Sequence, residues 1–164
     1  MVENLKLILF SFTASLGFGI VFHIKQKYLL WAGLGGALTR LCYLLLMEFI
    51  DERFFYSLLA AMLASIYAEI LAMEFKMPST VFLYPTILPL LPGSLLYHTA
   101  VNFFLRDREA MWENAANCAL ALLGISIGFV ITSTFTYYRR VYFLGKGIAS
   151  HFKRRPHLGK KKSD

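Results

Sequence analysis

The fold of this chain depends on the stretch Tyr84-Pro85-Thr86-Ile87-Leu88-Pro89-Leu90-Leu91-Pro92-Gly93-Ser94, in which three prolines and a glycine interrupt apolar sequence. Each proline removes a backbone donor and clashes with the preceding turn, so the stretch predicts an interrupted helix. Free carbonyl groups in hydrocarbon cost several kcal/mol each, so we expect the break to face protein or a polar cavity. Interrupted helices commonly form substrate sites in transporters, and residues 84–98 are therefore the first candidate site.

The composition indicates an integral membrane protein. Of the 164 residues, 57% are hydrophobic and only 16% are charged, too few polar side chains to cover a soluble domain. The runs Leu5–Phe22 and Leu29–Met47 match the roughly 20 residues that a helix needs to span a bilayer.

We predict an all-α membrane protein with five transmembrane helices, the fourth of them interrupted by proline and glycine. Ser79 or Thr80 is expected to cap the fourth helix. The five-helix domain is expected to cover residues 1–142, and residues 143–164 to form a disordered, basic cytoplasmic tail. The expected spans are about Leu5–Phe22, Leu29–Phe49, Phe54–Met73, Thr80–Leu105 and Ala115–Tyr138.

The basic residues predict the orientation. Nine of the 17 lysines and arginines lie from Arg139 onward, and lysines and arginines accumulate on the cytoplasmic side of membranes. This assigns the C-terminus to the inside and, with five spans, the N-terminus to the outside. The inner side then also holds Lys25, Lys27 and Lys76, and the outer side holds Lys6, Arg53, Arg106 and Arg108.

Several function classes are disfavoured by the sequence. The basic tail beside a membrane helix indicates contact with anionic lipid, so we expect no nucleic-acid partner. Cys42 and Cys118 lie in apolar stretches, where cysteine behaves as a small buried hydrophobic residue, so no disulfide is expected. The four histidines form no cluster with the cysteines, so no metal or cofactor is expected. No P-loop, nucleophile elbow or helical HExxH motif is present, so we expect no enzyme.

Two charged residues lie inside predicted spans. Arg40 is near the middle of the second, where a charge costs at least a few kcal/mol unless it is paired or solvated. It is interpreted either as an anion-binding cation or as a structural pair with a partner chain. Glu69 lies towards the inner end of the third span. It is either a proton- or substrate-coupling carboxylate, or an interfacial residue that is hydrated or paired with Lys76.

The interrupted span offers the remaining candidates. Pro85, Pro89 and Pro92 share one face if the local turns stay helical, and freed carbonyls with nearby hydroxyls would bind a zwitterion or a carboxylate. The alternative is a helix that is kinked only for packing. The expected substrate-path residues are Arg40, Glu69, Tyr84, Thr86, Pro89, Pro92, Gly93, Ser94, Tyr97 and His98. The expected helix-packing residues are Gly33, Gly35, Gly36, Gly124 and Gly128.

Five motifs occur along the chain in the order Gly19–Phe22, Trp31–Ala37, Ala68-Glu69, Lys76–Phe82 and Pro85–Tyr97. Together they resemble the threonine/serine exporter family, specifically its small, YjjB-like subunit. The resemblance covers roughly residues 15–138, and the proline-glycine segment with its following tyrosine is its most specific part.

The resemblance implies a bacterial inner-membrane exporter of threonine and serine, or of small dicarboxylates such as succinate, driven by the proton motive force. It also implies a second five-helix subunit with a soluble N-terminal domain, and a homo-oligomer is possible in addition. A five-span chain that starts outside fits the second half of such a ten-helix assembly.

Two positions depart from the family pattern. Arg40 stands where a neutral residue is expected, and His23-Ile24-Lys25 replaces an Asn-Val-Pro-like turn. A central cation favours a dicarboxylate over a zwitterionic amino acid. The competing hypothesis is a non-transporting membrane scaffold or assembly subunit, in which the interrupted helix only binds a partner.

Overall fold

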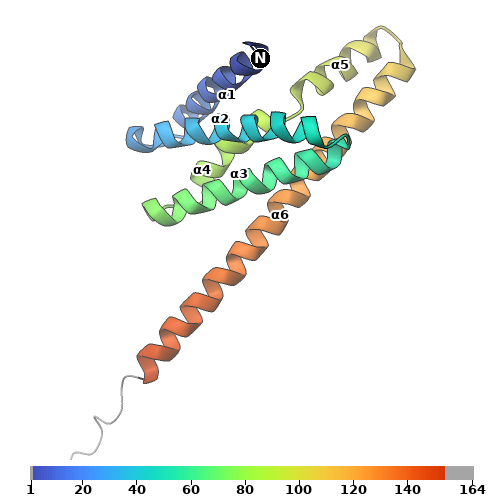
Figure 1. Cartoon of the computed structure of the whole chain (residues 1–164). Helices are drawn as coiled ribbons and strands as arrows, with labels where there is room; N and C mark the ends of the chain where they lie inside the picture. The colour runs from blue at the N-terminus through green and yellow to red at the C-terminus, as the bar shows by residue number, and fades with distance from the viewer. Residues whose placement is uncertain (1, 154–164) are drawn as a thin grey trace, which may run out of the picture. The chain divides into compact units, whose positions relative to one another are not determined.

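The computed structural model describes residues 2–153, and side chains from Glu3 to Arg139. Every regular element among these residues is helical (Figure 1). The elements are α1 (Val2–Val21), α2 (Gln26–Phe49), α3 (Arg53–Phe75), α4 (Thr80–Ile87), the 3-10 turn η1 (Leu88–Leu90), α5 (Gly93–Phe104) and α6 (Arg108–Lys153).

The predicted all-α membrane fold is confirmed. Four helices are long and apolar enough to cross a bilayer, and a bent pair of shorter helices brings the number to five if the pair forms one span. The halves of the pair, Thr80–Leu90 and Gly93–Phe104, meet at 49°. Because the bend is well below a right angle, the second helix continues in the same general direction along the axis of the first. At 1.5 Å per residue the pair rises about 30 Å, the thickness of the hydrocarbon layer.

The chain divides into two compact units, Met1–Thr132 and Ser133–Asp164. Within the second unit, α6 is helical to Lys153, so residues 143–153 of the expected disordered tail form helix instead. Between Arg108 and Pro156 no proline removes a backbone donor, which explains why the helix runs so far. Residues 154–164 lie outside the described part of the chain.

Glycines bring α1, α2 and α4 close together. A Cβ added at Gly33 would lie 2.8 Å from a methyl group of Leu16 on α1, and one at Gly36 would overlap the hydroxyl of Ser15. A Cβ at Gly35 would lie 2.6 Å from Thr86 Oγ1 on α4. One turn of α2 therefore makes room for two neighbouring helices.

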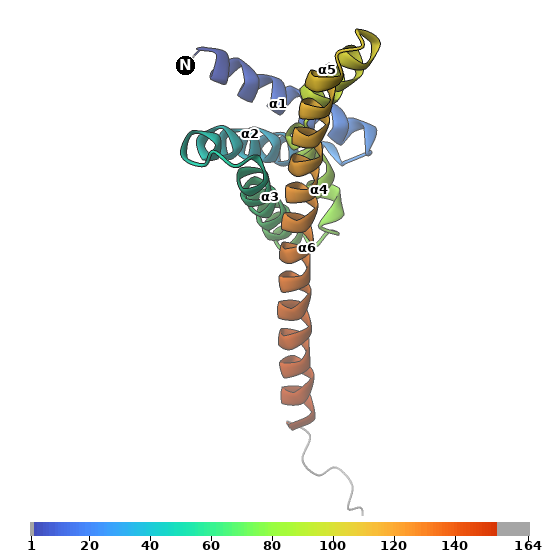
Figure 2. The ribbon, with the colours of Figure 1, turned by 90° about the vertical axis from the view of Figure 1, so that its right-hand side faces the viewer.

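Two glycines of α6 also allow a close approach, in this case to α3. A Cβ at Gly124 would lie 2.5 Å from the Phe54 carbonyl oxygen, and one at Gly128 would lie 2.5 Å from the Leu58 carbonyl oxygen. Figure 2 shows this part of α6 passing α3 and α4. Ile125, between the two glycines, packs with alanines of α3 and with Leu90 of η1. Two glycines four residues apart thus allow backbone-to-backbone contact.

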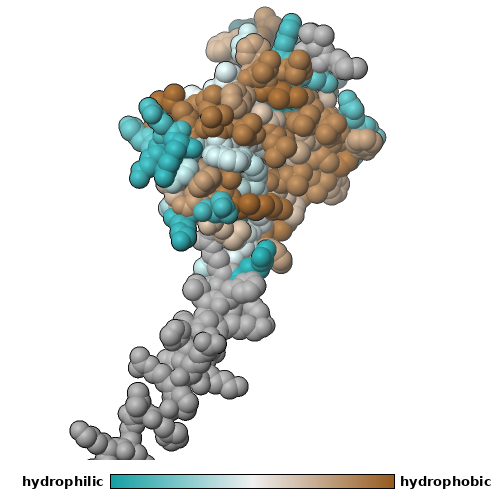
Figure 3. Space-filling view, turned by 60° about the vertical axis from the view of Figure 1, so that its left-hand side comes forward, coloured by the Kyte–Doolittle hydropathy of each residue, from teal (hydrophilic) through white to brown (hydrophobic). Residues whose placement is uncertain are grey.

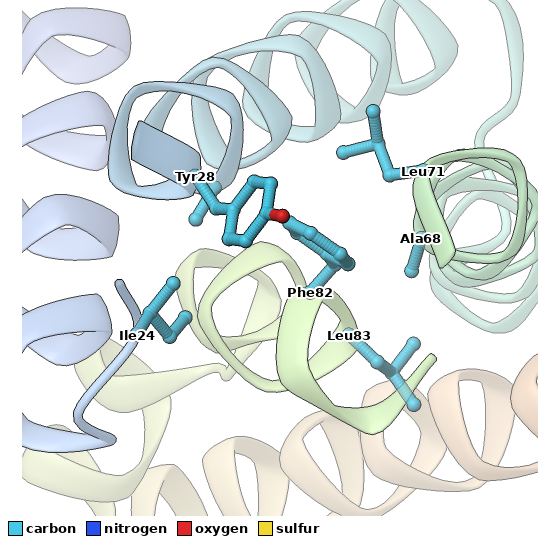
Figure 4. Packing of buried hydrophobic residues seen from close by; sticks show 7 residues of the cluster. Ile24, Tyr28, Ala68, Leu71, Phe82 and Leu83 are labelled. Atoms are coloured by element: carbon cyan, nitrogen blue, oxygen red, sulfur yellow. The ribbon is translucent and has the colours of Figure 1, made fainter. Parts of the chain in front are cut away.

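A hydrophobic cluster fixes the start of α4 against α2 and α3. Figure 4 shows Tyr28 and Phe82 side by side, with ring centroids 6.1 Å apart and ring planes at 82°. Phe75 packs on both rings, 4.7 Å from Tyr28 and 5.8 Å from Phe82. The buried members of the cluster are Ile24, Tyr28, Ala32, Ala68, Leu71, Phe82 and Leu83.

The proline break is held by a hydrogen bond from another helix. Pro89 has no N–H to donate to the carbonyl of Pro85 four residues earlier. Ser15 Oγ on α1 donates to this carbonyl oxygen at 2.7 Å, and Ser15 is fully buried. The Leu91 N–H donates to the Leu88 carbonyl at 3.2 Å and closes the 3-10 turn. The expected break in the helix is confirmed. At the Pro85 carbonyl the break faces α1 of the same chain.

One expectation at the start of α4 is wrong in its detail. Ser79 occupies the N-cap position, but no side-chain cap hydrogen bond forms there. Ser79 has helical φ and ψ angles of −60° and −29°, whereas a capping residue usually adopts extended geometry to aim its hydroxyl at the first turn.

Much of the surface is apolar. On the face drawn in Figure 3, brown hydrophobic residues dominate, and teal hydrophilic residues form separate patches towards its edges. Leucine, isoleucine and phenylalanine side chains on all the long helices are exposed, among them Leu45 and Ile70. This distribution is expected for helices that face lipid.

Candidate functional site

A groove of about 530 Å³ lies where the proline break meets α1, α2 and the start of α3. We call it the arginine groove. The break contributes seven consecutive residues, α1 contributes four, α2 contributes three and α3 contributes one. The lining residues are Leu7, Phe10, Ser11, Ala14, Arg40, Tyr43, Met47, Arg53 and residues 89–95.

Two arginines give the groove its charge. Arg40, on α2, and Arg53, the first residue of α3, are both half-buried, and no acidic side chain lines the groove. The Arg40 guanidinium lies 5.3 Å from the centre of the Tyr43 ring, within cation–π range. Tyr43 also lies within electrostatic range of Arg53 and packs at right angles on Tyr56, with ring centroids 5.1 Å apart. Tyr43 thus interacts with both cations and is itself held by Tyr56.

The first turn of α5 adds a further positive element. Gly93, Ser94 and Leu95 line the groove, and they are the first three residues of a 12-residue helix. Pro92 occupies the N-cap position and no side chain caps this helix. The N–H groups at a helix start carry partial positive charge and bind anions readily. Two guanidinium groups and a helix N-terminus in one groove are suited to a carboxylate.

Half of the expected substrate-path residues meet in this groove. Arg40, Pro89, Pro92, Gly93 and Ser94 all line it. They come from two segments that are about 50 residues apart in sequence, and α1 supplies further lining residues.

The other five expected residues lie elsewhere. Tyr84 is exposed, and its ring centre lies 5.5 Å from that of Phe22 at the end of α1. Thr86 is fully buried, and its hydroxyl donates to the Phe82 carbonyl at 2.7 Å. Tyr97 and His98 are exposed on α5, and Glu69 is half-buried on α3.

Sequence reasoning missed Arg53 as a site residue. Its place at the end of a span led us to use it for orientation alone. The signal was its position directly after the tight turn between the second and third spans, because that turn returns α3 alongside the half of α2 that carries Arg40. Tyr43 was missed as well, although it follows Arg40 by three residues and so shares its helix face.

No metal site accompanies the groove. Within residues 2–153, no three histidine, cysteine, aspartate or glutamate side chains are grouped so that they would hold an ion.

The comparisons agree with the membrane architecture. The family model described as "Threonine/Serine exporter, ThrE" matches residues 7–135, which include all the residues of the arginine groove. No curated protein and no solved structure matches the chain.

Proposed function

Because the chain belongs to the threonine/serine exporter family, we propose that it is one subunit of a secondary exporter of small polar metabolites, driven by the proton motive force. The arginine groove is the proposed substrate site. The observation that carries this assignment is the meeting of Arg40, Arg53 and the uncapped start of α5 beside a broken transmembrane helix. Discontinuous helices whose N-termini face an anionic substrate group are a recurrent device of secondary transporters.

The charge of the groove favours a small dicarboxylate such as succinate over threonine or serine. Arginine binds a carboxylate through two parallel hydrogen bonds, so two arginines match two carboxylates. A zwitterionic amino acid also needs an acceptor for its ammonium group. No carboxylate among the lining residues serves that purpose, although the Tyr43 ring and the hydroxyls of Ser11 and Ser94 remain as weaker partners.

The orientation inferred from the basic residues places the arginine groove in the outer half of the bilayer. Leu7 lies in the second turn of α1 and Arg53 begins α3, and both of these helix ends are assigned to the outside. The groove is then a site from which substrate leaves the cell. In this proposal Glu69, which is half-buried on the inner half of α3, carries the proton. Proton binding and substrate release then take place in different halves of the bilayer.

The surface of α5 supports a second subunit. No residue of α5 is buried, and Ser94, Tyr97 and His98 are exposed although they belong to a membrane span. Polar side chains that face lipid are costly, so another protein surface is expected to cover them. The proposed partner is a second five-helix subunit with a soluble N-terminal domain, and the proposed location is the bacterial inner membrane.

Efflux measurements test the proposal. Cells that express the chain together with its second subunit are loaded with labelled succinate, threonine or serine. Arg40→Gln should reduce succinate efflux at least tenfold, because one charge-assisted hydrogen-bonding group is removed. Lys27→Gln is the matched control, since Lys27 also lies over a tyrosine ring, 4.6 Å from the centre of Tyr28, but away from the groove.

The same variants separate the transporter from the competing scaffold hypothesis. A scaffold has no substrate site, so Arg40→Gln would leave efflux unchanged, or would abolish co-purification of the second subunit before efflux falls. Loss of efflux with intact co-purification is the result expected of a substrate-binding residue.

A further inference from the structure

A second groove, unrelated to the proposed transport path, lies at the turn between α5 and α6. Its volume is about 820 Å³, and it shares no residue with the arginine groove. We call it the hairpin groove. Its lining residues are Asn102, Phe103, Phe104, Arg106, Arg108, Met111 and Trp112.

The backbone of the turn is fixed by several hydrogen bonds. Arg106 adopts a left-handed conformation with φ of 59°, and its N–H donates to the Phe103 carbonyl at 3.2 Å. The Asp107 N–H donates to the Asn102 carbonyl at 3.0 Å. Asp107 Oδ1 accepts a hydrogen bond from the Ala110 N–H at 3.2 Å, as a cap of α6. The carboxylate between the two arginines is thus engaged by the backbone of α6.

The polar side of the hairpin groove is cationic. Of its seven lining side chains, Arg106 and Arg108 are charged, Asn102 is an amide and none is acidic. Both arginines are exposed. Two guanidinium groups two residues apart, with an amide nearby, provide several donors for one phosphate group.

The apolar side of the hairpin groove is aromatic. Phe103 and Phe104 pack edge to face, with ring centres 5.7 Å apart. Trp112 follows Arg108 by four residues, so the two lie on the same face of α6. Phe104 and Trp112 are 81% and 68% exposed, far more than aromatic side chains in water normally are. They lie at the end of one span and the start of the next, where aromatic side chains contact the bilayer interface.

We propose that the hairpin groove binds the phosphate of an anionic phospholipid, with Arg106 and Arg108 on the headgroup and Phe104 and Trp112 along the glycerol and the upper acyl chains. The two halves of the groove match the two halves of a lipid. A free phosphate ion would use the arginines but would leave the aromatic rim without a role. The inference does not depend on the transported substrate.

Trp112 provides a direct probe of this site. The chain has two tryptophans, so Trp31→Phe leaves Trp112 as the only one. The Trp31→Phe protein is reconstituted in nanodiscs of phosphatidylcholine that contain a small fraction of phosphatidylglycerol brominated on its acyl chains. Bromine quenches tryptophan fluorescence only at short range. We expect bound lipid to quench Trp112 at mole fractions where the same amount of brominated phosphatidylcholine has little effect.

Each basic residue near a membrane contributes about 1 kcal/mol to anionic-lipid binding, which is roughly a fivefold change in affinity. Arg106→Gln with Arg108→Gln should therefore reduce the preference for phosphatidylglycerol by about 10- to 30-fold. Lys6→Gln, at an exposed cation on α1 outside the groove, should leave the preference unchanged. Circular dichroism of each variant checks that the helices are intact.

Three results would overturn the proposal. The first is equal quenching by the two brominated lipids. The second is a preference that survives the double arginine substitution or falls equally with Lys6→Gln. The third is loss of the preference when millimolar inorganic phosphate is added, because the groove would then be a site for a free anion.

Discussion

Gly36 provides the sharpest test of the packing around the proline break. A Cβ at this position would overlap the Ser15 hydroxyl and would lie 2.7 Å from Ser15 Cβ and 3.2 Å from the Ser11 carbonyl oxygen. Part of this obstacle is backbone, so rotation of a side chain cannot remove it. Gly36→Ala should therefore force α1 and α2 apart.

Forcing an extra methyl group into a packed interior typically costs about 1–3 kcal/mol. For a chain of this length each kcal/mol lowers the unfolding midpoint by about 2–4 °C, so we expect Gly36→Ala to lower it by roughly 2–12 °C. Gly17 on α1 is the matched control, because a Cβ there meets nothing within 4 Å. Gly17→Ala should have no effect or stabilise slightly, since alanine favours helix by up to about 1 kcal/mol.

A thiol-reactive fluorogenic dye can follow the unfolding of both variants, since Cys118 is buried and Cys42 is half-buried. Ser15→Gly removes the side chain that the new methyl group meets, but it also removes the hydrogen bond to the Pro85 carbonyl. The double variant is therefore compared with Ser15→Gly alone, and adding Gly36→Ala should lower the midpoint less in this background than in the wild-type background. Equal midpoints for Gly36→Ala and Gly17→Ala would refute the packing argument. So would an equal loss from Gly36→Ala in the wild-type and Ser15→Gly backgrounds, because Ser15 would then not be the obstacle.

Three further predictions concern the break and the topology. Ser15→Ala should lower the midpoint in the same dye assay by an amount that corresponds to about 1–3 kcal/mol, because the Pro85 carbonyl loses its donor; an unchanged midpoint would show that another donor replaces it. Pro92→Ala should allow helix to continue through the break and should therefore abolish efflux, while the circular dichroism spectrum and co-purification of the second subunit are retained. Wild-type efflux in this variant would contradict the proposed role of the break. Asp51→Cys, in a cysteine-free background, should react with an impermeant maleimide in intact cells, and reaction only after permeabilisation would reverse the predicted orientation.

The helices could be predicted from sequence because a bilayer demands long apolar runs. The expected second span, Leu29–Phe49, differs from α2 (Gln26–Phe49) only at its first turn. The break at Pro85–Gly93 was also predictable, since each proline removes a specific backbone donor. The cap at Ser79 was not, because its geometry depends on how the chain leaves α3 through Lys76, whose φ is 52°.

The site was harder to predict, because it depends on contacts between distant residues. Ser15 and Pro85 are 70 residues apart, and nothing in the sequence pairs them. The three prolines were expected to share one face only if the local turns stayed helical, and that condition is not met. Pro85 is fully buried, whereas Pro89 and Pro92 line the arginine groove. The 3-10 turn between them changes the rotation per residue, so helical spacing does not carry across the break.

Of the two arginines in the arginine groove, the sequence predicted one as a site residue. Arg40 drew attention because a cation in mid-span is costly, whereas Arg53 ends a span, where cations are common. Only the fold shows that both line one groove with the first turn of α5. Consequently the sequence suggested an anion-binding cation, and the structure provides a second cation and a helix N-terminus beside it.

Binding of a small dicarboxylate tests the central claim most directly. The affinity of the purified protein with its second subunit for labelled succinate is compared with that of Arg40→Gln, Arg53→Gln and Lys27→Gln variants. A hydrogen bond to a charged group is worth about 1.5–3 kcal/mol, so each arginine substitution should weaken binding by roughly 10- to 150-fold, whereas Lys27→Gln should not. Succinate affinity that is unchanged in both arginine variants would contradict the assignment of the arginine groove as the substrate site.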